Sequence, residues 1–184
     1  MPDYGTTIIE RRRPEAPSEA TVSTARCIAY NAPQVRKAVR QCVEALPDMQ
    51  ELLGGGKSVL LKPNLLSTRY GPENHINTHP AVVFALAELL IQEFGCAVAI
   101  GDSCGSLTHG STAKAITVSR MDQVAATIGA RIYNVDTQPR HVVHFKEGRV
   151  YREIPLPSNL DQFDLIISVA KLKTHSLTLS LIHI

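Results

Sequence analysis

The sequence predicts an α/β fold, with a mostly parallel, doubly wound sheet and an inserted β-hairpin. Three short apolar runs, at residues 58–64, 96–100 and 164–169, are typical of strands buried on both faces. Amphipathic patterns of helical length separate such runs, and crossover connections of this kind make the strands parallel. At 184 residues, with 44% hydrophobic and 20% charged residues, the chain has the size and composition of one globular domain.

The composition argues against nucleic-acid and membrane partners. The net charge is only +2, and aromatic residues make up 5% of the chain with no Trp, so a base-stacking surface has little to be built from. The longest strongly apolar helical stretch, residues 81–90, is too short to cross a bilayer. Residues 14–23 follow three arginines but are polar, so no export signal is indicated and we expect a cytoplasmic protein.

The amino-terminal residues 1–23 mix Pro, Glu, Arg, Ser and Thr without periodicity. This predicts a flexible arm, in which only residues 7–9 have the character of a weakly paired strand. Residues 24–184 are predicted to form a single α/β domain, beginning with a strand at 25–30.

A first helix is predicted to begin at Asn31 and Pro33 and to be closed by Pro47. Its apolar positions recur at helical spacing: Val35, Ala38, Val39, Cys42, Val43 and Leu46. The glycines at 54–56 precede a strand instead of lying between a strand and a helix, so they predict a turn and not a phosphate-binding loop.

The strand at 58–64 should stop pairing at about Pro63, which has no N–H to donate. A second helix should begin at Pro80 with His79 as its N-cap, and Gly95 is a suitable C-cap. The buried strand at 96–100 follows.

The next helix is predicted to start at residues 119–122, which resemble a capping box, and to end near Gly129. A strand at 131–135 comes next. Residues 141–145 and 149–154, separated by a Glu-Gly pair, predict the hairpin inserted beside the sheet.

The four cysteines contain no C-x-x-C pair, so neither a zinc ribbon nor an iron–sulfur ligand run is present. We expect reduced thiols, with Cys42 and Cys96 in the core. His75 and His79 are four residues apart, but the intervening residues and Pro80 do not favour a regular helix, so no metal site is predicted.

Polar side chains follow each of the three apolar strands where the strand ends. They are Lys62 and Asn64 after the first, Asp102 and Ser103 after the second, and Lys171, Lys173 and His175 after the third. Because the carboxyl ends of parallel strands share one edge of a sheet, we expect these side chains to converge there. The alternative is a set of ordinary solvated strand ends.

Lysines at such an edge favour an anion, either a phosphate or a carboxylate. The start of the helix at Pro80, just after Thr78, would add free N–H groups. Asp102 would supply a counter-charge, a hydrogen-bond acceptor or a ligand for a hard metal ion.

At these residues the chain resembles the domain of unknown function 362 family. The resemblance rests on G-K-S-V-L-L-K-P-N at 56–64, T-H-P-A-V-V at 78–83, I-G-D-S at 100–103 and D-L-I-I-S-V-A-K-L-K-T-H at 164–175. Many members of that family carry a ferredoxin-like iron–sulfur module, such as a 4Fe-4S module, which implies a redox setting; this chain lacks the cysteine run for it. The family pattern continues past the last motif, so the resemblance implies a domain that is incomplete at its carboxyl end, with an exposed sheet edge.

Two hypotheses follow, and neither assigns a reaction. The first is a cytoplasmic, redox-associated enzyme-type domain that binds a small anionic ligand. In it Asp102 and His175 would be catalytic, and the substrate would be held by Lys62, Asn64, Thr78, Ser103, Lys171 and Lys173. The second is a non-catalytic module that docks an electron-transfer or other protein partner, or an inactive fragment.

Overall fold

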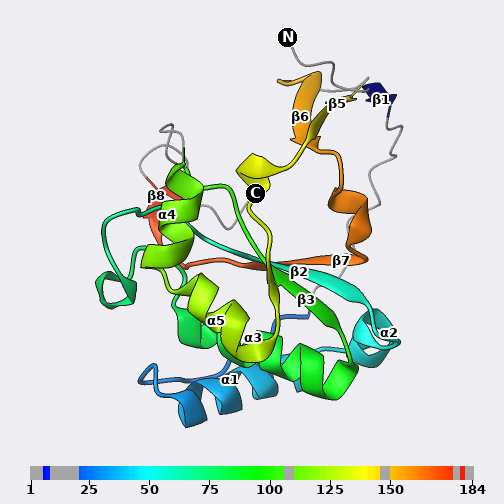
Figure 1. Ribbon diagram of the computed structural model, residues 1–184. Coiled ribbons are helices and arrows are strands. Elements are labelled where there is room, and N and C mark those ends of the chain that lie inside the picture. Colours follow the sequence, from blue (N-terminus) through cyan, green and yellow to red (C-terminus); the bar gives the residue numbers. More distant parts are fainter. Residues whose placement is uncertain (1–5, 9–20, 106–109, 146–149, 176–178, 181–184) are drawn as a thin grey trace.

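The fold is built on a four-stranded parallel sheet (Figure 1). A computed structural model describes residues 6–8, 21–105, 110–145, 150–175 and 179–180. The strands of the sheet are β2 (Ser58–Pro63), β3 (Ala97–Ile100), β4 (Arg131–Ile132) and β7 (Leu165–Val169). Their order is β4-β3-β2-β7, and every pairing is parallel.

The strand order reverses next to β2. The chain moves from β2 to β3 to β4 in one direction and then returns to place β7 on the other side of β2. The first connections run through α3 and α5 on one face, whereas the connection from β4 to β7 runs over the opposite face (Figure 1). The predicted fold class, a mostly parallel, doubly wound α/β sheet with an inserted β-hairpin, is therefore confirmed, and the hairpin belongs to a separate sheet.

Helices cover one face of the sheet, with α3 against the strands and α1 outside α3 (Figure 1). The α-helices are α1 (Ala32–Glu44), α2 (Met49–Leu53), α3 (Pro80–Phe94), α4 (Ser111–Val118) and α5 (Met121–Ile128). Short 3-10 helices are η1 (Pro72–Asn74), η2 (Val135–Thr137) and η3 (Leu160–Gln162). The main core lies between α3 and the sheet and includes Val59 and Leu61 of β2.

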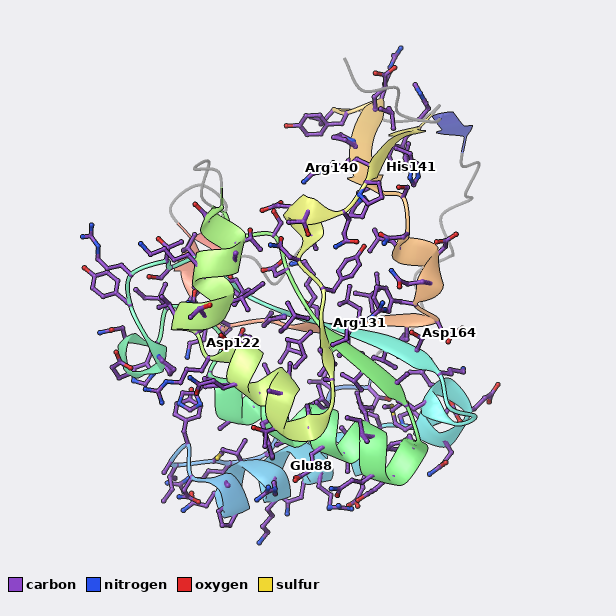
Figure 2. The ribbon with its side chains drawn as sticks, viewed as in Figure 1. Glu88, Asp122, Arg131, Arg140, His141 and Asp164 are labelled. Atoms are coloured by element: carbon purple, nitrogen blue, oxygen red, sulfur yellow. The ribbon has the colours of Figure 1, made fainter. Side chains whose placement is uncertain are left out.

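A smaller core lies on the opposite face, because side chains alternate along a strand. There Leu60 of β2 packs with Tyr133 and Phe163. Arg131, at the start of β4, lies over the Phe163 ring at 5.4 Å and donates to Gln162 Oε1 at 2.8 Å, which ties η3 to the sheet (Figure 2).

Several predicted helix ends are confirmed. The Asn31 carboxamide oxygen accepts from the backbone N–H of Gln34 at the start of α1. Gly95 and Gly129 end α3 and α5 with φ values of 65° and 71°, in the left-handed region that favours glycine.

The predicted capping box at 119–122 is wrong. Ser119 is the C-cap of α4, a helix that the sequence did not predict, and its hydroxyl donates to the carbonyl of Ile116. Arg120 is the N-cap of α5 and makes no side-chain cap. The two helices follow each other without a spacer, so the serine serves the end of the first helix and not the start of the second.

Three strand predictions need correction. Residues 25–30 form no strand and leave Ile28 exposed. β4 ends at Ile132, because Asn134 turns the chain by accepting from the N–H of Asp136. The expectation that β7 is buried on both faces is wrong. Ile166, on one face of this strand, is 47% exposed, and β7 is the edge strand of the four-stranded sheet.

The predicted hairpin is present, shifted by a few residues. It consists of β5 (Arg140–His144) and β6 (Glu153–Pro157), paired antiparallel. With β1 (Thr6–Ile8), which pairs parallel to β5 as the strand character of that segment suggested, it forms a separate sheet. Most of the predicted flexible arm lies outside the described residues. Near the other end, β8 (Thr174–His175) pairs with β9 (Leu179–Ser180).

Candidate functional site

The carboxyl ends of β2 and β7 meet at the point where the strand order reverses. In open α/β sheets such a switch point is where ligands bind, because the connections diverge to opposite faces and leave a crevice. Thr78 joins the two strand ends here. Its hydroxyl donates to the Val169 carbonyl at 2.7 Å and accepts from the Asn64 N–H at 2.8 Å. Thr78 is buried, and its hydroxyl both donates and accepts a hydrogen bond within the protein, so the role of Thr78 is structural.

Lys62 and Asp102 contact each other, as the sequence predicted for side chains at neighbouring strand ends. Lys62 Nζ lies 2.8 Å from Asp102 Oδ1, and Asp102 Oδ2 accepts from the Leu65 N–H at 3.0 Å. The Asp102 side chain is only 6% exposed, whereas that of Lys62 is 51% exposed. The aspartate therefore holds both the lysine and the loop that follows β2. The Asn64 side chain, which donates to the Ile76 carbonyl, closes the same loop.

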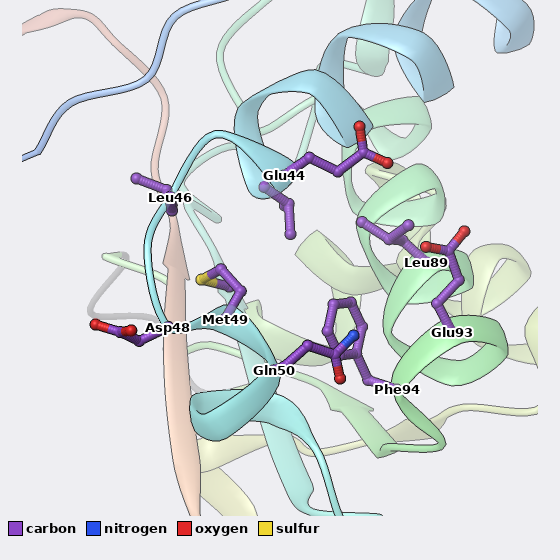
Figure 3. Close-up of a pocket in the computed structure, with 9 residues that line it drawn as sticks. Glu44, Leu46, Asp48, Met49, Gln50, Leu89, Glu93 and Phe94 are labelled. Atoms are coloured by element: carbon purple, nitrogen blue, oxygen red, sulfur yellow. The ribbon is translucent and has the colours of Figure 1, made fainter.

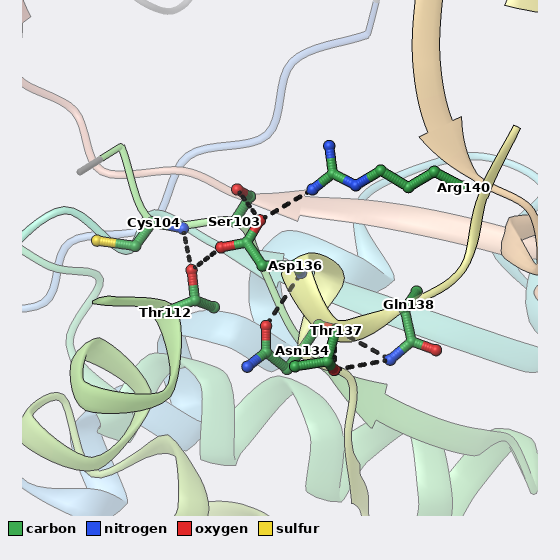
Figure 4. Close-up of polar contacts among 8 residues, drawn as sticks. All are labelled: Ser103, Cys104, Thr112, Asn134, Asp136, Thr137, Gln138 and Arg140. Atoms are coloured by element: carbon green, nitrogen blue, oxygen red, sulfur yellow. Dashed lines mark hydrogen bonds and ion pairs between the residues drawn. The ribbon is translucent and has the colours of Figure 1, made fainter. Parts of the chain in front are cut away.

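Ser103 belongs to a neighbouring hydrogen-bonded cluster around Asp136 (Figure 4). The hydroxyls of Ser103 and Thr112 donate to the two Asp136 carboxylate oxygens, and Arg140 lies 3.2 Å from one of them. Burial alone would raise the pKa of Asp136. The hydrogen bonds from Thr112 and Ser103 and the charge of Arg140 outweigh burial, so its pKa is lowered. The Ser103 hydroxyl is thus committed to a carboxylate.

A second group of side chains lies at the start of α3. The Tyr30 ring stacks on the His79 ring, with centroids 3.8 Å apart and planes 11° apart. Lys171 Nζ donates to the Tyr30 hydroxyl at 3.4 Å. His79 is the N-cap of α3, as predicted, and its Nδ1 accepts from the Ala81 N–H at 3.2 Å. Burial and the positive charges of Lys171, His75 and Arg120 lower the pKa of His79.

This second group is cationic and lacks described acidic partners. Burial and the charge of Lys171 lower the pKa of Lys173, so the two lysines are close enough to repel each other. Within the described part of the chain, no carboxylate forms an ion pair with Lys171, Lys173 or Arg120. An anion at this place would relieve the repulsion between the cations.

The predicted site residues fall into separate groups instead of one network. Val59 and Leu61 face α3, so alternation along β2 places Lys62 with Leu60 on the other face. Lys171 contacts Tyr30 on the α3 side. The backbone of His175 lies in β8, but its side chain is outside the described residues.

Protonation of His79 is expected to destabilise the fold. Because its pKa is lowered in the folded state, the unfolded chain takes up the proton first as the pH falls below about 6.5. The stability is therefore fully present above that pH and decreases as the pH falls towards the lowered pKa. Protonation would also remove the Nδ1 acceptor that caps α3.

His79→Asn tests this expectation, since asparagine is a good N-cap and does not titrate. Urea unfolding followed by circular dichroism at pH 7.5 and pH 5.0 should show a smaller loss of stability for the variant than for the unchanged protein. An equal loss in both proteins would assign the acid sensitivity to other groups.

A hollow of about 390 Å³ lies elsewhere, between the end of α1, α2 and the end of α3 (Figure 3). Glu44, Asp48 and Glu93 are among its lining residues. The carboxyl end of α3 is at the opposite edge of the sheet from the strand ends described above. This hollow, whose Glu44 and Glu93 both pair with Arg40, is therefore separate from the cationic groups.

The described cysteines do not fit an iron–sulfur cluster. Cys96 is buried as predicted and Cys104 is also buried, but Cys27 is exposed and Cys42 is partly exposed at the margin of the buried face of α1. Among the described residues, no group of three or more His, Cys, Asp or Glu side chains is arranged to hold a metal ion. Nor is any described helix long and apolar enough to cross a membrane.

Sequence reasoning missed three members of these groups. Tyr30 was assigned to a strand, and Asp136 was hidden because β4 was expected to continue to residue 135. Arg120 was taken as part of a capping box. The N-V-D-T segment at 134–137, an Asx-type turn directly after a strand, was the signal that could have revealed Asp136.

Comparison with known proteins shows which family this chain belongs to. The family described as domain of unknown function (DUF362) matches residues 59–180. The thylakoid-associated protein sll1697 of Synechocystis sp. is 30% identical over 162 residues, which cover 85% of this chain and 46% of that protein. The chain thus spans about half the length of this curated relative, and no solved structure matches it. Since this match covers about two thirds of the chain, the chain belongs to the DUF362 family.

Proposed function

We propose that this chain is an enzyme-type domain that binds a small anionic ligand where β2 and β7 end. The observation that carries the proposal is the group of cations without described acidic partners at the start of α3, formed by Lys171, Lys173 and Arg120 beside His79. The group lies next to the switch point of the sheet, where the crevice of an open α/β fold binds its ligand. The amino end of α3 adds the positive end of a helix dipole.

The predicted residues except Ser103, whose hydroxyl is bonded to Asp136, have a role in this proposal. Lys171 and Lys173 hold the anion, and Lys62, whose charge is balanced by Asp102, lies at the same edge on the other face. Thr78 and Asn64 keep the two strand ends together, so they position the lysines without contacting the ligand. His175 and the uncharged His79 are the candidates for proton transfer, and a cytoplasmic, redox-linked setting is part of the same proposal.

Lys171→Met is expected to weaken the binding of inorganic phosphate about tenfold, because one charge-assisted contact of roughly 1.4 kcal/mol is lost. Isothermal titration at low ionic strength measures the change. Lys37→Met, on the exposed face of α1, is the matched control and should leave the affinity unchanged. Equal affinities in the two variants, or no phosphate binding by the unchanged protein, would contradict the proposal.

A docking module is the second candidate function. It is favoured by Leu172, which is 79% exposed between Lys171 and Lys173 and so resembles an apolar contact within a basic rim. The name of the Synechocystis relative associates that protein with the thylakoid. Leu172→Ser separates the candidates, because it would weaken the capture of a protein partner and leave phosphate binding intact.

A further inference from the structure

An apolar groove of about 300 Å³ lies beside the cationic group at the start of α3. It is lined by Tyr30, Ala32, Arg36, Pro80, Ala81, Phe84, Ala85 and Val124. The groove therefore runs between the beginning of α1, the first two turns of α3 and α5. Its volume is at the lower end of the range for small-molecule sites, so it suits a short chain or one ring and not a folded partner.

The two ends of the groove differ in charge. Arg36 is neutralised, because its guanidinium forms two hydrogen bonds with the Glu88 carboxylate, one of them 2.9 Å long, and lies over the Phe84 ring. At the other end the positive charge of Lys171 lies beside Tyr30, because Lys171 Nζ donates to the Tyr30 hydroxyl. The His75 ring lies 6.0 Å from the Tyr30 ring at the same end, and the charge of Arg120 acts on His79, which stacks on Tyr30.

Tyr30 thus contacts both features, because its side chain lines the apolar groove and its hydroxyl accepts from Lys171 of the cationic group. We infer that the ligand is amphiphilic, with an anionic head held by Lys171 and an aliphatic or aromatic body in the groove. This inference rests on the proposed anion site and adds the ligand class. An anion without an apolar part would leave the groove wet, whereas burial of methylene groups against Phe84 and Val124 gains affinity.

A series of monoalkyl phosphates tests the ligand class on the unchanged protein. Inorganic phosphate and the ethyl, butyl and hexyl monoesters are titrated calorimetrically, below the concentrations at which they form micelles. Full burial of a methylene group is worth about a fourfold gain in affinity, so an open groove should give roughly twofold or more for each methylene added. If all four ligands bind with equal affinity, the groove inference is wrong and the anion site stands; if none binds, the proposed function itself fails.

Two leucine substitutions locate the effect. Ala81→Leu fills the groove from α3 and should abolish the dependence on chain length while inorganic phosphate still binds. Ala126→Leu adds the same side chain on the exposed face of α5 and should retain the full dependence. Lys171→Met should weaken every ligand by the same factor and leave the gain per methylene unchanged. A chain-length dependence that survives Ala81→Leu would place the alkyl chain elsewhere and overturn the inference.

Discussion

Gly101→Ala is expected to destabilise the fold by about 3 kcal/mol or more, because a methyl group there has no space and small-to-large changes in packed interiors cost roughly 1–3 kcal/mol even when the neighbours are mobile. A Cβ on Gly101 would lie 1.8 Å from the carbonyl oxygen of Tyr133 and 2.7 Å from its carbonyl carbon. These are backbone atoms, so no side-chain rotation relieves the clash. The backbone itself is held on both sides, since the Gly101 N–H donates to Leu61 and the Tyr133 N–H donates to Ile100.

Gly105→Ala is the matched control for Gly101→Ala. It changes a glycine in the same loop after β3, but its Cβ would meet only the side-chain carbon Cδ1 of Leu66, at 3.1 Å, and that side chain can move. Chemical denaturation followed by far-ultraviolet circular dichroism gives both free energies of unfolding; the chain has no Trp for fluorescence. Comparable stabilities for the two variants would mean that β3 and β4 can separate without cost, and the close approach would then have no structural importance.

The sequence predicted the elements whose signals are local. The start of α3 follows from Pro80 and its end from Gly95, because a fixed φ and a left-handed cap are properties of single residues. β2 was predicted for a similar reason, since Pro63 ends an unbroken apolar run. Here local preference and tertiary structure agree, and the boundaries differ by a residue or two at most.

Elements that depend on a neighbour were predicted poorly. Residues 25–30 have strand-forming side chains, but in the described structure no strand pairs with them, and a strand exists only through its partner. α4 has a short and weakly amphipathic pattern, and its stability comes from burial of Thr112, Ala115 and Ile116. Sequence periodicity does not record such contacts.

The candidate site shows the same division. That polar groups gather at one edge followed from the parallel sheet, and the contact between Lys62 and Asp102 agrees with it. Which face each side chain occupies depends on the register of β2 against β7, and that register places Lys62 opposite Ser168. The cations at the start of α3, His75, Arg120, Lys171 and Lys173, come from three separate segments, so only the folded chain brings them together.

Asp102→Ala is expected to lower the free energy of unfolding by about 2–3 kcal/mol, the usual cost of leaving a buried donor unsatisfied after loss of a charged acceptor. The substitution removes the acceptor of the Leu65 N–H, which lies in the core and has no access to water. Lys62 loses its partner as well, but its side chain is half exposed and returns to solvent at little cost. The lost stability should therefore come from the loop after β2 and not from Lys62.

Asp102→Asn separates the two contributions, because its carboxamide oxygen still accepts from Leu65 while the charge is lost. Its cost should be about 1 kcal/mol, within the range of a partly exposed ion pair. A double-mutant cycle with Lys62→Met then gives the energy of the ion pair alone, which should be smaller than the difference between the Ala and Asn variants. If Asp102→Ala and Asp102→Asn are equally stable, the Leu65 hydrogen bond contributes nothing, and the role of Asp102 would reduce to holding Lys62 at the carboxyl edge of the sheet.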